Sequence, residues 1–135
     1  MEKNTYIYPA IFTYEDGYDI AVTFPDIELA TQGEDEYEAL EMAKDALGGR
    51  LYCMERDGDA IPLPTSLKDV ELEKNEKVIL VEVFMPAVRM AEINKSVTRT
   101  VTLPAWLSAE ASKRGVNFSR VLQEALTEHL GLSRT

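Results

Sequence analysis

The sequence has little of what most catalytic and metal sites require. Its 135 residues include one cysteine, Cys53, and one histidine, His129. A single cysteine excludes an intrachain disulfide, and the two side chains together are too few ligands for a zinc site. Nucleophilic catalysis needs a base beside the nucleophile, and the only histidine lies near the end of the chain. The sequence therefore predicts a protein that is not an enzyme and that holds no metal and no cofactor.

Long apolar runs are also missing. The chain has no stretch of about 18 apolar residues and no charged-then-apolar leader at its start. We therefore expect no contact with a membrane and a cytoplasmic location. Glycine-rich phosphate loops and internal repeats are absent as well. Hydrophobic residues make up 45% of the chain, which suffices for one ordinary core, or for two small ones if one is shared between subunits.

The formal charge of −10 is unevenly distributed along the chain. Residues 1–94 carry 21 acidic and 8 basic side chains, a net charge of −13, whereas residues 95–135 carry 3 acidic and 6 basic ones, a net charge of +3. Only the C-terminal part has a charge compatible with a phosphate backbone, and the acidic body suits a basic partner. The alternative is that the acidity only keeps the protein soluble, and composition by itself favours this interpretation.

Residues 95–132 have the pattern of one strand followed by two short helices. Apolar and hydroxyl side chains alternate up to Leu103, and most are β-branched, which indicates a half-buried strand that Pro104 ends. Gly115 predicts a left-handed end to the first helix, and Asn117 can cap the second, which continues to Gly131. The apolar residues at helical spacing are Leu107 and Ala111 in the first helix and Val121, Leu122, Ala125, Leu126 and Leu130 in the second.

A single strand with two short helices buries too little apolar surface to fold alone, and both of its edges are open. Two copies paired antiparallel about a two-fold axis would close one edge each and stack four helices into a common core. This arrangement resembles the ribbon-helix-helix family of DNA-binding proteins over about 38 residues. In that family the paired strands enter the major groove of operator DNA. The resemblance implies that Thr98, Thr100 and Thr102 read the bases, and that the protein is a homodimer through this domain.

The same resemblance implies a set of phosphate contacts. The family holds the DNA backbone at the start of its second helix, where free N–H groups and the positive end of the helix dipole point outward. Arg99 departs from the pattern, since the family usually has an aliphatic residue at this position; it is expected at the edge of the dimer, near a phosphate or a carboxylate. The expected phosphate-binding residues are Lys95, Arg99, Asn117, Phe118, Ser119 and Arg120.

The first 85 residues predict a small α+β domain. β-forming residues at 5–14 and 18–24 flank Asp16-Gly17, which indicates a hairpin, and residues 29–32 can form a short third strand. The stretch from Asp35 to Glu38 has capping-box spacing and begins a helix of roughly 22 residues. Residues 78–85 are almost continuously apolar, which predicts a central strand covered on both faces. Residues 86–94 are expected to be a hinge or a short helical linker.

This part resembles the HicB family of antitoxins in three segments: Phe24-Pro25-Asp26-Ile27; residues 30–33 with the Glu-Ala-Leu at 38–40; and Ile61-Pro62-Leu63-Pro64. The resemblance implies an α+β fold with an N-terminal truncated RNase H-like domain (residues 1–85), a linker (86–94) and a C-terminal ribbon-helix-helix domain (95–135). It implies a HicA-type, mRNA-cleaving toxin as the partner, autorepression of the operon, and possible tetramers through the N-terminal domain. The expected toxin-binding residues are Tyr18, Asp26 and Glu28.

Two other functions compete with this hypothesis. An RNase H-like nuclease needs carboxylates on its central strands to hold two divalent ions, and residues 6–12 contain none. The remaining alternative is a ribbon-helix-helix transcription factor whose N-terminal domain senses a small molecule. An adjacent reading frame for a basic protein of well under 100 residues would favour the antitoxin.

Overall fold

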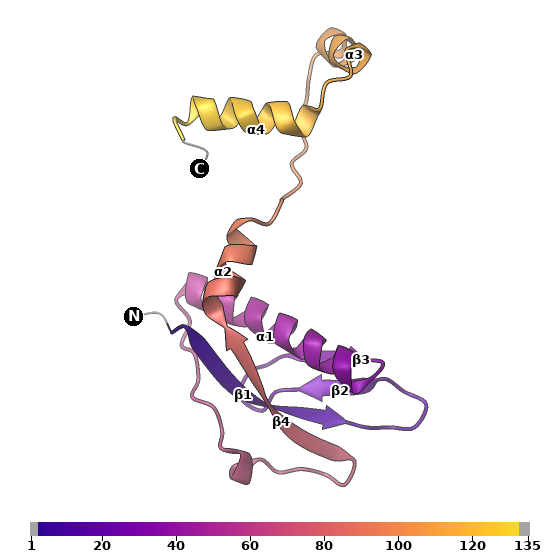
Figure 1. Ribbon diagram of the computed structural model, residues 1–135, viewed down its shortest axis with the longest axis vertical. Helices are drawn as coiled ribbons and strands as arrows, with labels where there is room; N and C mark the ends of the chain where they lie inside the picture. The colour runs from indigo at the N-terminus through magenta and orange to yellow at the C-terminus, as the bar shows by residue number, and fades with distance from the viewer. Residues whose placement is uncertain (1–2, 133–135) are drawn as a thin grey trace. The chain divides into compact units, whose positions relative to one another are not determined.

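The computed structural model describes residues 3–132. By its internal contacts the chain divides into two compact units, Met1–Ser96 and Val97–Thr135. The N-terminal unit holds the sheet and two helices, and the C-terminal unit holds two further helices (Figure 1). The acidic and basic parts of the sequence therefore correspond closely to these two units.

The N-terminal unit is built on a four-stranded antiparallel sheet. Its strands are β1 (Thr5–Thr13), β2 (Ile20–Thr23), β3 (Ala30–Gly33) and β4 (Glu76–Phe84), in the order β3-β2-β1-β4. Gly17, with a φ of 83°, provides the left-handed residue in the turn between β1 and β2. The hairpin, the short third strand and the later strand predicted from the sequence are all confirmed.

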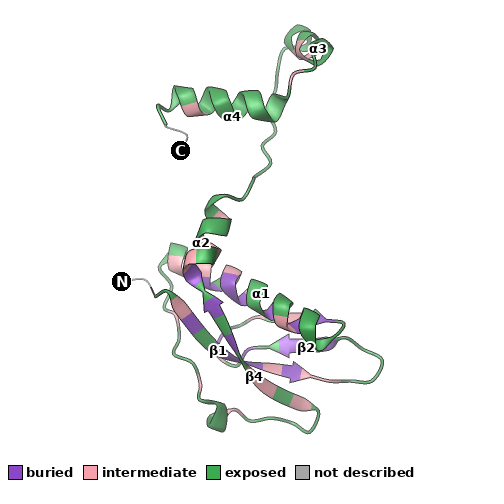
Figure 2. Ribbon diagram, in the orientation of Figure 1, coloured by how far each residue is buried: buried purple, intermediate pink, exposed green. Residues whose placement is uncertain are grey.

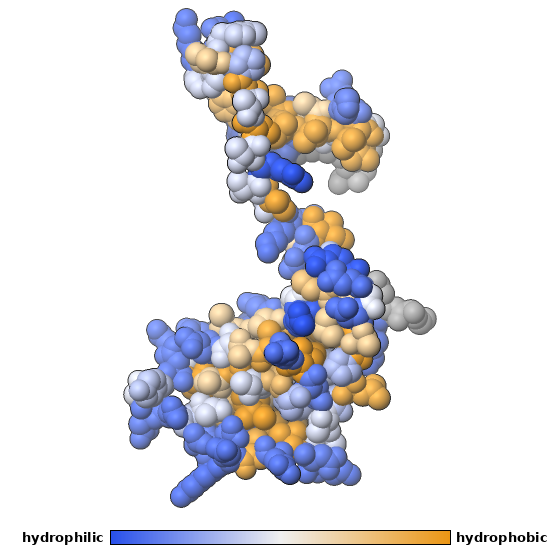
Figure 3. Space-filling view, turned by 180° about the vertical axis from the view of Figure 1, so that it is seen from behind, coloured by the Kyte–Doolittle hydropathy of each residue, from blue (hydrophilic) through white to orange (hydrophobic). Residues whose placement is uncertain are grey.

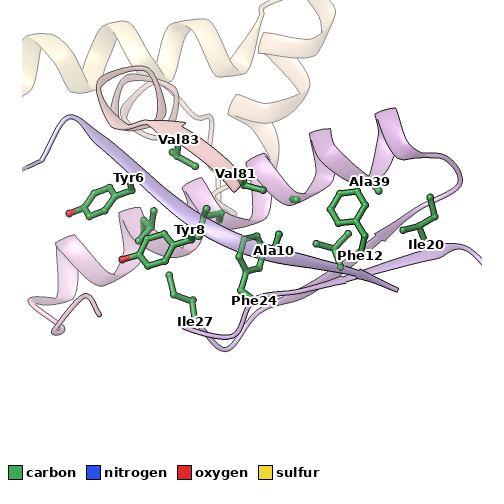
Figure 4. Close-up of a cluster of buried hydrophobic side chains, with 14 of the residues drawn as sticks. Tyr6, Tyr8, Ala10, Phe12, Ile20, Phe24, Ile27, Ala39, Val81 and Val83 are labelled. Atoms are coloured by element: carbon green, nitrogen blue, oxygen red, sulfur yellow. The ribbon is translucent and has the colours of Figure 1, made fainter. Parts of the chain in front are cut away.

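One helix, α1 (Glu36–Asp57), packs on one face of this sheet. The Asp35 carboxylate accepts a hydrogen bond from the Glu38 backbone N–H at 2.8 Å, and Gly58 ends the helix with a φ of 72°. The predicted length and cap are confirmed. The core between helix and sheet is shown in part in Figure 4 and in purple in Figure 2. It includes Tyr8, Ala10, Phe12, Val22, Ala43, Leu47, Leu51 and Val81.

The position of β4 corrects one prediction. The strand is apolar from Val78 to Val81 but lies at the edge of the sheet, where among the described residues it pairs with β1 alone. Val81 and Val83 are buried toward α1, whereas Leu80 is 52% exposed and Phe84 is 58% exposed. Apolar character on both parities predicts burial on both faces, yet in the described residues only one face of this strand is covered by a helix. The outer face and the outer edge stay open.

The helical alternative predicted for residues 86–94 is confirmed, but this helix packs on the N-terminal unit. Helix α2 (Met85–Ile93) begins directly after β4 and belongs to the N-terminal unit, because Met85 is fully buried and Val88 packs against the core. A Cβ added at Gly48 would lie 3.1 Å from Val88, so this glycine lets α2 approach α1 closely. The N-terminal unit thus extends to Ser96 rather than to residue 85.

An ion pair fastens α2 to α1. The Arg89 guanidinium donates to both carboxylate oxygens of Glu55, at 3.0 and 2.7 Å, and to the Lys3 carbonyl at 2.7 Å. The two side chains are only 18% and 10% exposed. A forked, partly buried pair of this kind holds its geometry better than a surface pair. No periodic pattern in the sequence predicts this ion pair, because its partners lie 34 residues apart.

We expect Arg89→Ala to destabilise the N-terminal unit by about 2 to 3 kcal/mol, because it leaves a partly buried carboxylate without its charged donor. Urea unfolding of the full chain, followed by circular dichroism, measures this loss. Arg56→Ala is the matched control: Arg56 pairs with Asp57 at 3.0 Å, but the two side chains are 60% and 52% exposed. Its removal should change the free energy of unfolding by less than about 0.5 kcal/mol. Equal losses in both variants would contradict the fastening role.

The C-terminal unit contains α3 (Ala105–Lys113) and α4 (Phe118–His129). Gly115 and Gly131, with φ values of 67° and 66°, end the two helices as predicted. Residues 97–104 are extended but form no strand, because no other segment among the described residues pairs with them. No described residue of this unit is buried, and Figure 2 shows it almost wholly in the exposed colour.

Candidate functional site

In the extended segment at 98–103, before α3, alternate side chains form two groups with different surroundings. Arg99, Val101 and Leu103 line a groove of about 370 Å³ together with residues of α3 and α4. Thr98, Thr100 and Thr102 have the opposite parity, do not line this groove, and are exposed. The three threonines are thus available to contact a ligand, while the alternate side chains face the helices.

The groove itself is apolar. It is lined mainly by Leu107 and Ala111 of α3, by Val116 of the turn, and by Phe118, Val121, Leu122 and Ala125 of α4. Val121 is 50% exposed and Leu126, on the same helix, is 49% exposed. In Figure 3 the helices of this unit show a run of strongly hydrophobic side chains at the surface. Soluble proteins seldom leave so large a share of their leucine and valine side chains in contact with water, so this face indicates an interface.

The start of α4 provides the backbone groups that an anion needs. The Asn117 side chain caps the helix and accepts from the Arg120 N–H at 3.1 Å. The N–H groups of Phe118 and Ser119 lie in the first turn, where a helix offers them no carbonyl partner. The Phe118 side chain lines the groove, so only its backbone can serve a phosphate.

The structure places the basic candidates in three different settings. Arg120 forms an exposed i,i+4 pair with Glu124 at 3.2 Å, which a phosphate can displace at little cost. Lys95 is exposed, and its backbone N–H bonds to the Glu92 carbonyl at the end of α2, so it belongs to the N-terminal unit. Arg99 lines the same groove as Val101 and Leu103. This arginine, at a position where the ribbon-helix-helix family usually has an aliphatic residue, therefore places a cation beside an apolar groove.

The candidate toxin contacts lie around β2. Tyr18 is 77% exposed in the turn before this strand, and Glu28 is exposed in the loop that follows it. Asp26 is half-buried, and its carboxylate accepts from the Thr65 N–H at 2.9 Å and from the Thr65 hydroxyl. Asp26 therefore anchors the loop that follows α1. No local pattern in the sequence predicts this contact, because Thr65 lies 39 residues away.

Tyr6, Tyr8 and Tyr14 of the acidic unit have structural roles. Tyr6 and Tyr8 are buried in the core, which removes them as a platform for RNA bases. The Tyr8 hydroxyl donates to the Pro62 carbonyl, and burial, with Tyr6 and Asp26 nearby, raises its pKa above the usual value. The hydroxyl therefore remains a proton donor at neutral pH. Tyr14 donates to Glu36 at 3.0 Å.

Two further observations concern chemistry and location. Among residues 3–132 no three histidine, cysteine, aspartate or glutamate side chains gather as a metal ion would require. No helix in the described part of the chain is long and apolar enough to cross a membrane.

Comparison with known proteins adds named relatives. No family model matches the chain. Antitoxin HicB 1 of Photorhabdus laumondii is 42% identical over 76 residues, which are 53% of this chain and 48% of that protein. Antitoxin HicB of Escherichia coli K12 is 40% identical over 87 residues, 58% of this chain and 62% of that protein. The chain thus spans about half to three-fifths of the length of the curated relatives it matches.

Two solved structures share the fold. One is a toxin–antitoxin complex from Streptococcus pneumoniae, with a TM-score of 0.61 and 26% identity, covering 93% of this chain and 99% of that chain. The other is the antitoxin HicB of Burkholderia pseudomallei, with a TM-score of 0.52 and 20% identity, covering 93% and 98%. At that identity the second likeness concerns the fold alone. Together with the sequence relatives, these matches confirm the resemblance predicted from residues 24–64.

Proposed function

We propose that this relative of the HicB antitoxins is itself an antitoxin, with a HicA-type toxin as its partner and its own operator as a second target. The N-terminal unit, a truncated RNase H-like domain in this proposal, binds the toxin. The C-terminal unit pairs with a second copy as a ribbon-helix-helix dimer and binds DNA. No catalytic step is part of the proposal.

The observation that carries the proposal is the contrast between the two units. The N-terminal unit, residues 1–96, has its own core and carries 21 acidic and 9 basic side chains, a net charge of −12. A toxin that cleaves mRNA must bind a polyanion, so a basic surface is expected on it, and opposite charge speeds its association with an acidic unit. Exposed Tyr18 and Glu28 are the proposed contacts on the toxin-binding side, with Asp26 holding the adjacent loop.

The open apolar face supports the second half of the proposal. Pairing two segments 97–103 antiparallel would satisfy the backbone groups that lack a partner in one chain, and it would bury the groove-lining side chains of both copies. Thr98, Thr100 and Thr102 of both strands would then face outward together, into the major groove. Lys95, Arg99, Arg120 and the start of α4 would flank them as phosphate contacts, with the N-terminal units free to join dimers into tetramers.

Co-purification tests the proposal as a whole. The tagged full chain should retain the product of the adjacent reading frame, a basic protein of well under 100 residues, and should shift a DNA fragment carrying the promoter. Salt should weaken the DNA complex steeply, since phosphate contacts release counterions. A chain that binds neither, and whose DNA affinity responds to a metabolite, would favour the sensor function.

Thr100→Ala should reduce the preference for operator over random DNA more than it reduces binding to random DNA. One lost base contact is worth about 1 to 3 kcal/mol, roughly 5- to 150-fold in the operator affinity. Gel shifts on both DNAs at one salt concentration measure the two losses. Thr23→Ala, an exposed strand threonine of the N-terminal unit, is the control and should leave both affinities unchanged. Equal losses on both DNAs would refute the assignment of Thr100 as a reader.

A further inference from the structure

The outer edge of β4 is nine residues long, and its middle carries no charge. Residues 78–81 read Val-Ile-Leu-Val, the strand contains no proline, and Lys77 is its only basic residue. In the part of the chain that the structure describes, β1 is the only strand that pairs with it. Proteins generally shield such edges with short strands, bulges, prolines or charges, because an exposed row of N–H and C=O groups recruits another strand. This edge is therefore a surface prepared for pairing.

A groove runs beside this edge. A hollow of about 460 Å³ lies between β4, α1 and α2, and its lining includes Lys44, Asp45, Glu82, Phe84 and Val88. A second hollow of about 230 Å³ shares Lys44, Asp45 and Val88 with the first and continues to Gly49 and Glu92. Because the two hollows share these residues, they form one groove, hereafter the edge groove. All of its lining belongs to the N-terminal unit.

Gly49 in this groove has no role in the packing of the chain. It lies within α1, and a Cβ built on it meets no atom within 4 Å, whereas a Cβ on Gly48 meets Val88 and Val83. A glycine inside a helix costs about 1 kcal/mol relative to alanine, so close approach explains Gly48 but nothing within the described residues explains Gly49. The empty space above Gly49 is consistent with an occupant that comes close to the helix backbone.

The charge of the edge groove favours one kind of occupant. Three carboxylates, on Asp45, Glu82 and Glu92, and one lysine, Lys44, line the groove; Lys44, Asp45 and Glu82 are exposed and Glu92 is half-buried. The Glu82 and Asp45 side chains form no hydrogen bond or ion pair within residues 3–132. A second copy of this unit would bring another net charge of −12 to the same place, which opposes association, whereas a basic partner gains from it.

We propose that the edge groove binds an extended, basic segment of the partner protein, which adds a fifth strand beside β4. The identity of that partner as the small toxin rests on the proposed function, whereas the groove, its charge and the open edge do not. Main-chain hydrogen bonds to the edge supply affinity, and the side chains of the added strand supply specificity.

The side chains of β4 predict the sequence pattern of the added strand. Val78, Leu80 and Glu82 share the outer face of the sheet, since side chains of one face recur every two residues. Residues directly opposite on a neighbouring strand lie about 4.5 to 5.5 Å apart and pair by chemistry. The added strand should therefore carry apolar side chains opposite Val78 and Leu80 and an arginine or lysine opposite Glu82.

Two substitutions in the full-length chain test this site, each with a matched control. Leu80→Lys puts a charge on the edge, and Leu63→Lys makes the same change at a loop leucine that is 85% exposed. Gly49→Gln fills the groove, whereas Gly49→Ala gives the same gain in helix propensity with a single methyl group. Circular dichroism and thermal unfolding establish that all four variants are folded.

The probe is the purified product of the adjacent reading frame, with affinity measured by calorimetry. We expect Kd to rise at least tenfold for Leu80→Lys and Gly49→Gln and to stay within threefold of the parent for Leu63→Lys and Gly49→Ala. Hydrogen exchange should show that the outward-pointing amides of residues 77–83, which do not bond to β1, become protected on binding. Glu28→Gln, at the other side of the sheet, should slow association without changing that protection.

Several outcomes would overturn the site. If the parent chain binds the probe and both test variants bind equally well, the edge groove is not the contact, while the proposed function stands. If the outward-pointing amides of β4 are already protected without the probe, and Leu80→Lys halves the mass of the particle in light scattering, the occupant is a second copy. If the parent chain does not bind the probe at all, the proposed function itself fails.

Discussion

Leu126→Asp is expected to abolish both pairing of the C-terminal unit and DNA binding. Leu126 is 49% exposed in the single chain, and Val121 and Leu122 of the same helix are exposed to a similar degree. The described residues of this unit therefore form no core of their own. In the proposed dimer the side chain is buried, and the substitution removes a leucine and places an unpaired carboxylate there. Loss of each buried leucine costs about 2 to 5 kcal/mol, and a two-fold dimer loses two. The dimer should therefore weaken by more than about 1,000-fold.

Analytical ultracentrifugation and gel shifts on the promoter fragment measure this result. Gln123→Asp is the matched control, because it adds the same charge to the same helix at an exposed polar position. It should leave the dimer intact and weaken DNA binding little. A Leu126→Asp protein that stayed dimeric through this unit and still bound the operator would show that the helix faces are assigned incorrectly.

Truncation after Ser96 is expected to separate the two functions completely. Residues 1–96 contain the sheet, both of its helices, the Arg89–Glu55 ion pair and a continuous core, so they should fold without the C-terminal unit. Cells that express this fragment should survive induction of the adjacent toxin gene, while repression of the promoter is lost. The reason is that toxin contacts are proposed within the N-terminal unit and DNA contacts outside it.

The position of the cut decides whether this experiment can be interpreted. A fragment that ends at residue 85 loses Val88 and Arg89, and with them the packing of α2 on α1. That fragment is the control: it should be much less stable and should protect poorly, which distinguishes loss of fold from loss of a contact. A folded 1–96 fragment that neither binds nor neutralises a small basic partner would contradict the antitoxin proposal. A response of the full chain to a metabolite would then favour the sensor.

The local structure of this protein could be predicted from its sequence, because the signals for turns and helix ends lie in neighbouring residues. Asp35 and Gly58 mark the ends of α1, Gly17 marks the hairpin turn, and Gly115 marks the end of α3; all four act within a few residues of their own position. The uneven charge distribution and the resemblance to HicB antitoxins could also be recognised in the sequence, because both depend on the composition and the order of the residues. The alternation at 95–103 predicted which side chains face the helices of the C-terminal unit.

Which sheet edges and which apolar faces remain uncovered could be seen in the tertiary structure alone. The apolar run at 78–85 is compatible with a central strand and with an edge strand. The hydrophobic pattern of a strand does not show how many strands lie beside it. Contacts between distant residues, Asp26 with Thr65 and Glu55 with Arg89, are set by how the sheet and helices pack. For the same reason, residues 86–94, which were predicted to be a hinge or a short helical linker, form most of a helix that packs in the first unit. The groove beside β4 exists only because three elements that are separate in sequence meet there.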